Sequence, residues 1–186
     1  LVLSGLRGIG MSPEFAFKTF HLLLLLFAAF GAARLIRALV PQSSSWMHLI
    51  AAVLFVANPY TITAGATLAI ALPMAFLPWM LLCLVHALQR PKSWAWPALG
   101  GVTFFLMSGM NVAVVPFFSL LAIIPLVVAL WRDYGLTTRS VLVVLSRTAL
   151  FVILLSTYWL VPAFVALGTG SQIVEGSETL DGIAKV

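Results

Sequence analysis

Polar and apolar positions along this chain are segregated into long blocks. Three stretches, residues 38–89, 93–131 and 148–174, contain no Asp, Glu, Lys or Arg and are mostly apolar. A soluble globule needs a charged exterior, and runs of this length leave none. A helix of about 20 apolar residues crosses the roughly 30 Å of bilayer hydrocarbon while pairing its own backbone groups. The pattern therefore predicts a membrane protein built from helices.

Six helical crossings fit these blocks. We predict them over residues 15–40, 46–60, 68–88, 94–107, 112–131 and 141–167, with an extracytoplasmic loop or tail at 168–186. Pro73 and Pro78 each remove a backbone donor from the third crossing, so that helix is expected to bend. The fourth and fifth are at the short limit for a crossing, and one of them is a candidate re-entrant segment. The predicted fold class is an all-α, polytopic membrane helix bundle with kinked or short helices.

Composition supports the membrane assignment. Hydrophobic residues make up 62% of the chain and charged residues 8%, whereas about 25% charged is ordinary for a soluble protein. In a soluble protein, a net charge of +5 would suggest nucleic-acid binding. Here the basic residues are scattered over three junctions, so we expect membrane lipids with an anionic leaflet as partners, and no nucleic acid.

The charges between the predicted spans indicate their orientation. Lysine and arginine concentrate in short cytoplasmic loops. They fall at every second junction, at Arg34, Arg37, Arg90, Lys92, Arg132, Arg139 and Arg147. Both ends of this segment are therefore expected on the extracytoplasmic side of the cell membrane. An outside start at Leu1, without an initiator methionine, predicts that the chain is an excerpt that lacks at least one earlier span.

Few side chains offer chemistry. No carboxylate lies inside a predicted span, which disfavours an ion-coupled carrier because such carriers usually keep one there. His21, His48 and His86 lie on different segments without Cys, Asp or Glu at ligand spacing, so we interpret them as interface or packing residues. Cys83, the single cysteine, is interpreted as a buried apolar residue. The sequence assigns no catalytic residue, no metal ligand and no cofactor.

Polar side chains gather instead at the predicted extracytoplasmic junctions. Asn58 lies at the end of the second span, Asn111 lies between the fourth and fifth, and Glu175 lies in the final segment with two further acids. These groups are candidates to line an outward-facing cavity. The competing interpretation is that the asparagines cap helix ends and that the acids are solvated in a loop.

Four short motifs, taken in order, resemble a known family. They are VANPY at 56–60 followed by LPMAFLPW at 72–79, MSGMNVA at 107–113, YWLVP at 158–162 and IVEGS at 173–177. Over residues 42–186 this order resembles the actinobacterial alpha-(1->3)-arabinofuranosyltransferase D family. One departure is Ala-Ile-Ala at 69–71, where the family tends to place a Ser-Glu pair, so a polar outer position has become apolar.

The resemblance implies a GT-C membrane glycosyltransferase. Such an enzyme moves arabinofuranose from a polyprenyl-phosphate donor to a cell-envelope arabinan on the outer face. The implied partners are the lipid-linked sugar donor, the arabinan acceptor and the rest of the parent chain, which is expected to carry the catalytic base on an earlier outer loop. Glu175, Asn111 and Asn58 are the implied substrate-binding residues. The alternative function is a noncatalytic membrane subunit or a carrier of lipid or substrate.

Overall fold

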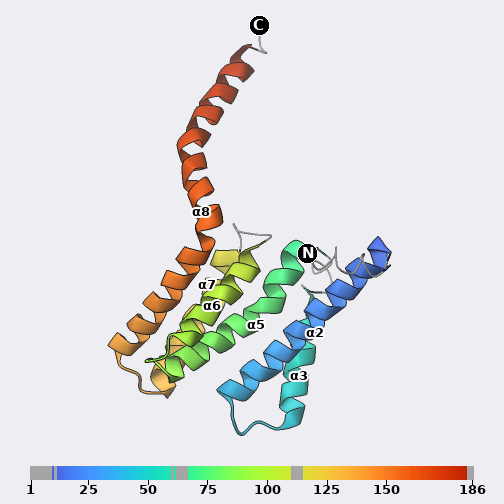
Figure 1. Cartoon of the computed structure of the whole chain (residues 1–186), viewed down its shortest axis with the longest axis vertical. Helices are drawn as coiled ribbons and strands as arrows, with labels where there is room; N and C mark the ends of the chain where they lie inside the picture. Colours follow the sequence, from blue (N-terminus) through green and yellow to red (C-terminus); the bar gives the residue numbers. More distant parts are fainter. Residues whose placement is uncertain (1–9, 11, 60, 62–66, 110–114, 184–186) are drawn as a thin grey trace.

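The computed structural model describes residues 10, 12–59, 61, 67–109 and 115–183, and at 115–118 and 167–183 it describes the backbone. Within these residues the regular structure is helical throughout (Figure 1). The helices are α2 (Pro13–Leu39), α3 (Ser45–Val56), α5 (Leu68–Gln89), α6 (Ala95–Ser108), α7 (Val115–Asp133) and α8 (Thr138–Ile183). The predicted all-α helix bundle is confirmed.

Local sequence signals set the ends of α2. The Ser12 hydroxyl accepts a hydrogen bond of 3.3 Å from the Phe15 N–H, and Pro13 occupies the first helical position. Glu14 in the first turn and Arg37 in the last turn both complement the helix dipole. With 27 residues, α2 is about 40 Å long, more than the hydrocarbon thickness of a bilayer.

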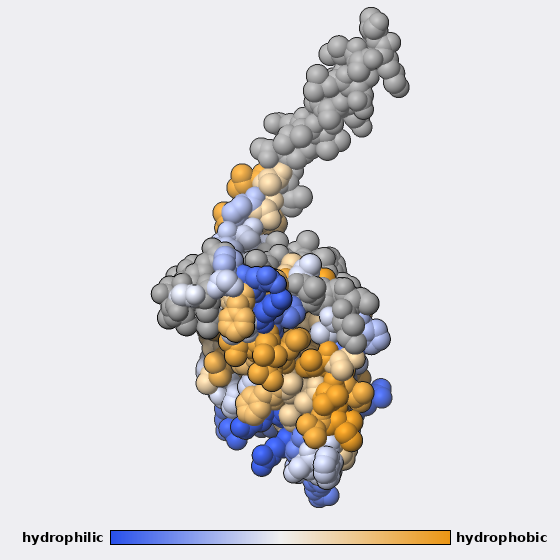
Figure 2. Space-filling model, turned by 90° about the vertical axis from the view of Figure 1, so that its right-hand side faces the viewer, coloured by the Kyte–Doolittle hydropathy of each residue, from blue (hydrophilic) through white to orange (hydrophobic). Residues whose placement is uncertain are grey.

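Within the described residues, three helices are long and apolar enough to cross a membrane: α2, α5 and the Thr138–Ala166 part of α8. Large apolar side chains are exposed along their surfaces, among them Leu22, Leu26, Leu142 and Leu154. Figure 2 shows a band of hydrophobic side chains across the middle of the viewed face and hydrophilic side chains at its lower end. An apolar surface of this extent needs lipid around it, so the chain is a membrane protein.

α3 and α6 are the two shortest of the described helices, and both are shorter than the hydrocarbon is thick. α3 has 12 residues and α6 has 14, or about 18 and 21 Å at 1.5 Å per residue. α3 ends before the crossing predicted over 46–60 would end, because Asn58 turns the chain and donates its amide N–H to the Phe55 carbonyl at 2.5 Å. α6 agrees with the short fourth helix that we expected. The number of complete crossings stays a prediction.

The last helix differs from the sequence-based expectation. A crossing over 141–167 followed by a loop or tail was predicted, but α8 remains helical from Thr138 to Ile183. Figure 1 shows its C-terminal part projecting beyond the other helices and changing direction along its length. Pro162 lies inside α8 and removes one helical hydrogen bond, which favours a bend. The polar residues after 167 thus continue the helix, and their backbone hydrogen bonds are made within α8.

α5 lies at the centre of the bundle, between α2 and α6, and it also contacts α7 and α8. It continues through Pro73 and Pro78, and Pro78 is fully buried. The largest apolar cluster joins α5 to α7 and α8 through Leu88, Val85, Val127, Val141 and Val144, among others. A second cluster joins α2 to α5 through small residues, which let the two helices approach closely.

The basic junctions gather at one end of the molecule. The turns between α2 and α3, between α5 and α6 and between α7 and α8 all lie at the lower end in Figure 1. The end of α6, the start of α7 and the projecting part of α8 lie at the other end. We call the lower end, which carries Arg37, Arg90, Lys92, Arg132 and Arg139, the basic end.

Candidate functional site

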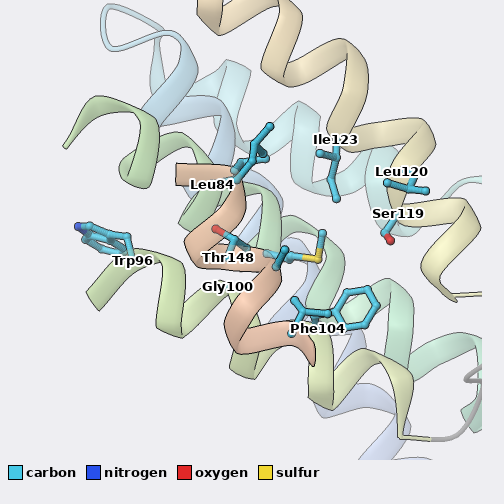
Figure 3. Close-up of a pocket in the computed structure, with 12 residues that line it drawn as sticks. Leu84, Trp96, Gly100, Phe104, Ser119, Leu120, Ile123 and Thr148 are labelled. Atoms are coloured by element: carbon cyan, nitrogen blue, oxygen red, sulfur yellow. The ribbon is translucent and has the colours of Figure 1, made fainter. Parts of the chain in front are cut away.

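A cavity of about 350 Å³ lies between α5, α6, α7 and α8 (Figure 3). Apolar side chains dominate its lining, which includes Met80, Leu84, Trp96, Phe104, Leu120, Ile123 and Val152. Two hydroxyl side chains, Ser119 and Thr148, also line it. The Thr148 hydroxyl donates to the Val144 carbonyl of its own helix at 3.0 Å, so it adds little polarity to the wall.

The cavity is open on the side where α7 and α8 meet the lipid. Leu120 is 48% exposed and Ala149 is also exposed, although both line the cavity. A second groove of about 380 Å³ between α7 and α8 shares Leu120, Ile123 and Leu145 with it. The two apolar volumes therefore lie next to each other, with these three side chains in the wall of both.

Glycines on α6 allow α8 to approach and so shape the cavity wall. A Cβ atom on Gly101 would lie 2.5 Å from Cβ of Phe151, a distance that real side chains do not adopt. At neighbouring Gly100, which lines the cavity, a Cβ would meet Thr148 at 3.4 Å. The close contact of α6 and α8 thus depends on the glycine pair, and the cavity opens beside it.

The predicted substrate-binding residues do not meet at this cavity in the described part of the chain. The Asn58 amide is occupied locally: its N–H donates to the Phe55 carbonyl and to Thr61 Oγ1 at 2.8 Å, and its oxygen accepts from the Thr61 N–H at 2.9 Å. These bonds favour the helix-capping interpretation. Asn111 lies outside the described residues, and Glu175 lies on α8 where the backbone is described. Their substrate contacts stay predictions.

No ionisable side chain is among the described residues that line the cavity, although His86 packs against the lining Trp96, with ring centroids 4.5 Å apart. Glu14 is exposed and pairs with Lys18 at 2.6 Å, and Asp133 ends α7 at the basic end. His48 contacts the Ser43 hydroxyl at 2.7 Å, and His86 contacts the Gln89 side chain at 3.1 Å. In this part of the chain no three potential metal ligands come together. The cavity can hold an apolar group, but its described lining supplies no acid or base.

Sequence reasoning did not find this cavity. Its wall combines α6 and α8 residues that are far apart in the sequence, such as Gly100 and Thr148. The sequence does show a four-residue spacing within each helix, between Gly100 and Phe104 on α6 and between Thr148 and Val152 on α8. Such spacing marks one face of a helix but does not say which two faces meet.

Comparison with known proteins places the chain in a family. A family model described as alpha-(1->3)-arabinofuranosyltransferase, N-terminal GT-C domain, matches residues 10–174. No curated protein and no solved structure matches the chain. The match covers every helix from α2 to α7 and most of α8, including all the residues that line the cavity.

Proposed function

We propose that this chain, which belongs to the alpha-(1->3)-arabinofuranosyltransferase N-terminal GT-C domain family, forms part of a membrane glycosyltransferase. The enzyme moves arabinofuranose from a polyprenyl-phosphate donor to a cell-envelope arabinan on the outer face of the membrane. Its partners are the lipid-linked donor, the arabinan acceptor and the surrounding lipids.

The observation that carries this proposal is the apolar cavity between α5 and α8. Its volume of about 350 Å³ falls in the range of small-molecule sites, roughly 300 to 1,000 Å³. The donor is attached to a long isoprenoid chain, which needs an apolar surface inside the protein when its sugar is presented for transfer. The lining side chains and the opening beside Leu120 supply such a surface with access from the membrane.

The chemistry of transfer needs a general base that activates the acceptor hydroxyl, and groups that stabilise the departing phosphate. Neither Glu14 nor Asp133 lies at the cavity, so neither is placed to act there. We propose that the base lies on an earlier outer loop of the parent protein, which is what the family resemblance implies. Glu175 and Asn111 are proposed to contact the sugar, and alanine at either position lowers arabinose transfer while membrane insertion is kept.

The distribution of charge supports the outer-face assignment. Arginine and lysine collect at the basic end, which the positive-inside rule assigns to the cytoplasm. The opposite end, from which α8 projects, then faces outward. The proposed donor carries its sugar on that side, and the arabinan acceptor is also there.

A cavity-filling substitution tests the proposal. Ala149→Trp places an indole in the cavity opening, and Leu150→Trp places the same side chain at a neighbouring exposed position that does not line the cavity. In membrane vesicles containing the full-length protein, A149W lowers transfer of labelled arabinofuranose from a long-chain donor by about tenfold. L150W keeps wild-type transfer. Equal transfer by A149W and the wild type contradicts the use of this cavity.

One observation favours a second function, that of a noncatalytic subunit that holds lipid. The described cavity lining contains no titratable side chain. In that case vesicles with the wild-type protein bind the isoprenoid chain in an A149W-sensitive manner but transfer no arabinose. Transfer by the wild-type protein excludes this alternative.

A further inference from the structure

Two buried polar atoms on α8 have no hydrogen-bond partner. They are the hydroxyl oxygen of Ser156 and the indole nitrogen of Trp159. Ser156 is 1% exposed, so water does not reach its hydroxyl. A buried donor without a partner costs about 1 to 3 kcal/mol, and buried polar groups in native proteins are almost always paired. The pair is therefore a candidate for binding an oxygen atom that comes from outside the chain.

Both atoms belong to the helix face that lines the cavity. Leu145, Ala149 and Val152 line it, and Ser156 and Trp159 follow Val152 by four and seven residues. Residues at these intervals share one face of an α-helix. The apolar wall of the cavity is thus continued by two polar groups toward the end of the bundle from which α8 projects.

A buried serine on α6 lies at the corresponding level. α6 and α8 rise in parallel from the basic end (Figure 1), with Gly100 facing Thr148. Four residues further, Phe104 belongs to a cluster against which Val152 packs. Four residues further along each helix are Ser108 on α6 and Ser156 on α8, which are 0% and 1% exposed. The two serines therefore form one polar layer above the apolar cavity.

This layer lies in the outer half of the crossing predicted over 141–167. Ser156 is 18 residues beyond the start of α8 at Thr138, which places it about 27 Å from the basic end. Trp159 is one turn further, at about 31 Å. The layer adjoins the apolar cavity on the side away from the basic end, so an isoprenoid chain in the cavity can carry its polar end toward it.

The layer is poor in charge. Among the described residues, Lys18 is paired with Glu14, and the remaining lysines and arginines, including Arg34 and Arg147, lie at or toward the basic end. Ser156 and Trp159 offer neutral O–H and N–H donors. Such donors suit the neutral oxygens of a sugar, whereas a phosphate is normally held by charge-assisted bonds from lysine or arginine.

We propose that the Ser156 hydroxyl and the Trp159 indole N–H donate hydrogen bonds to oxygens of the donor's pentose. This assignment rests on the proposed function, because the pentose is held here while its isoprenoid chain fills the cavity below. Ser108 completes the layer from α6: its hydroxyl donates to the Phe105 carbonyl at 3.0 Å and can accept a hydrogen bond from a sugar hydroxyl. These three residues are specificity-determining positions for the sugar.

Conservative substitutions in the full-length protein test the assignment. Ser156→Ala removes the hydroxyl, and Trp159→Phe keeps an aromatic ring but removes the N–H. Each raises the KM for the polyprenyl-phosphate arabinofuranose donor about 5- to 10-fold, the effect of one lost hydrogen bond, with a smaller change in kcat. The matched control is Thr157→Ala, because Thr157 is exposed and its hydroxyl bonds its own helix at Leu154. T157A keeps the wild-type KM.

Donors that lack one sugar hydroxyl separate binding from structural effects. For the donor whose missing oxygen is the one bound, wild type and S156A have the same KM, because the contact is absent from both. S156A folds as stably as wild type, since it removes an unsatisfied donor. An S156A penalty that persists with every deoxy donor overturns the assignment, as does an unchanged KM in both variants. A wild-type protein that transfers no arabinose overturns the proposed function itself.

Discussion

The indole N–H of Trp79 on α5 donates a hydrogen bond of 3.1 Å to the backbone carbonyl of Phe27 on α2. The two rings also stack, with their centroids 4.8 Å apart. This approach is possible because Gly31, one turn after Phe27, has no side chain: a Cβ there would lie 2.6 Å from the indole nitrogen. In an apolar medium the N–H needs a partner, so the bond fixes how α2 and α5 face each other.

Trp79→Phe is expected to lower the stability of the bundle modestly. The phenyl ring keeps part of the stacking on Phe27, but the hydrogen bond is lost, which lowers the free energy of unfolding by about 0.5 to 1.5 kcal/mol. Unfolding of the purified protein in mixed micelles measures the change. Trp46→Phe is the matched control, because Trp46 is 72% exposed and is expected to change stability by less than about 0.5 kcal/mol. Equal values for the two variants contradict a role for the Trp79 bond.

Alanine at the three helix-contact glycines is expected to give a graded series. Gly101→Ala is the most damaging, because its Cβ would meet Cβ of Phe151 at 2.5 Å and the Phe151 backbone carbonyl carbon at 3.0 Å. Gly31→Ala is intermediate, since the indole of Trp79 can shift. Gly100→Ala is the mildest, because its Cβ would lie 3.4 Å from a Thr148 methyl group.

Overpacking of this kind destabilises by about 1 to 3 kcal/mol, so G101A and G31A fall in that range. G100A serves as the control for the helix-favouring effect of alanine, which acts at all three positions. Melting temperatures in detergent measure the order. A G101A protein as stable as G100A contradicts the close approach of α6 and α8.

Arg147 connects α8 to the turn before α6 and is expected to be the most important arginine for stability. Its guanidinium donates to the Pro91 carbonyl at 2.8 Å and lies 4.2 Å from the ring centre of Trp94. Arg147→Lys loses the planar stacking and is expected to destabilise by about 1 kcal/mol. Arg139→Lys is the matched control, because Arg139 is exposed. Urea unfolding in micelles compares R147K with R139K. Equal urea midpoints for the two variants contradict a structural role for Arg147.

Labelling of introduced cysteines tests the orientation of the two ends. Cys83 is buried at 7% exposure and is first replaced by alanine. Gln42→Cys lies in the exposed turn at the basic end, and Ser12→Cys lies at the opposite end of α2. The positive-inside rule predicts that a membrane-impermeant maleimide labels S12C in intact cells and Q42C only after permeabilisation. The reverse pattern overturns the orientation, and labelling of both in intact cells contradicts a membrane-crossing α2.

Some features of this protein were predictable because they depend on one segment at a time. The hydropathy of residues 15–40 or 68–88 can be compared directly with the bilayer thickness, and α2 and α5 lie close to those bounds. Local signals such as Ser12-Pro13 and Asn58-Pro59 act through their own backbone neighbours. The length of α3 and the continuation of α8 were less accessible, because helix ends depend on caps and turns as much as on hydropathy.

By itself, then, the sequence determined a helical membrane protein with its basic junctions at alternate turns, since length, hydropathy and charge suffice for that. The tertiary structure decided which helix faces meet. α2 carries apolar residues on all sides, so its periodicity did not reveal that Gly31 faces Trp79. In lipid, helices associate through close packing and shared hydrogen bonds rather than through a buried apolar stripe. For the same reason, the cavity between α5 and α8 and the layer formed by Ser108 and Ser156 emerged only once the helices were assembled.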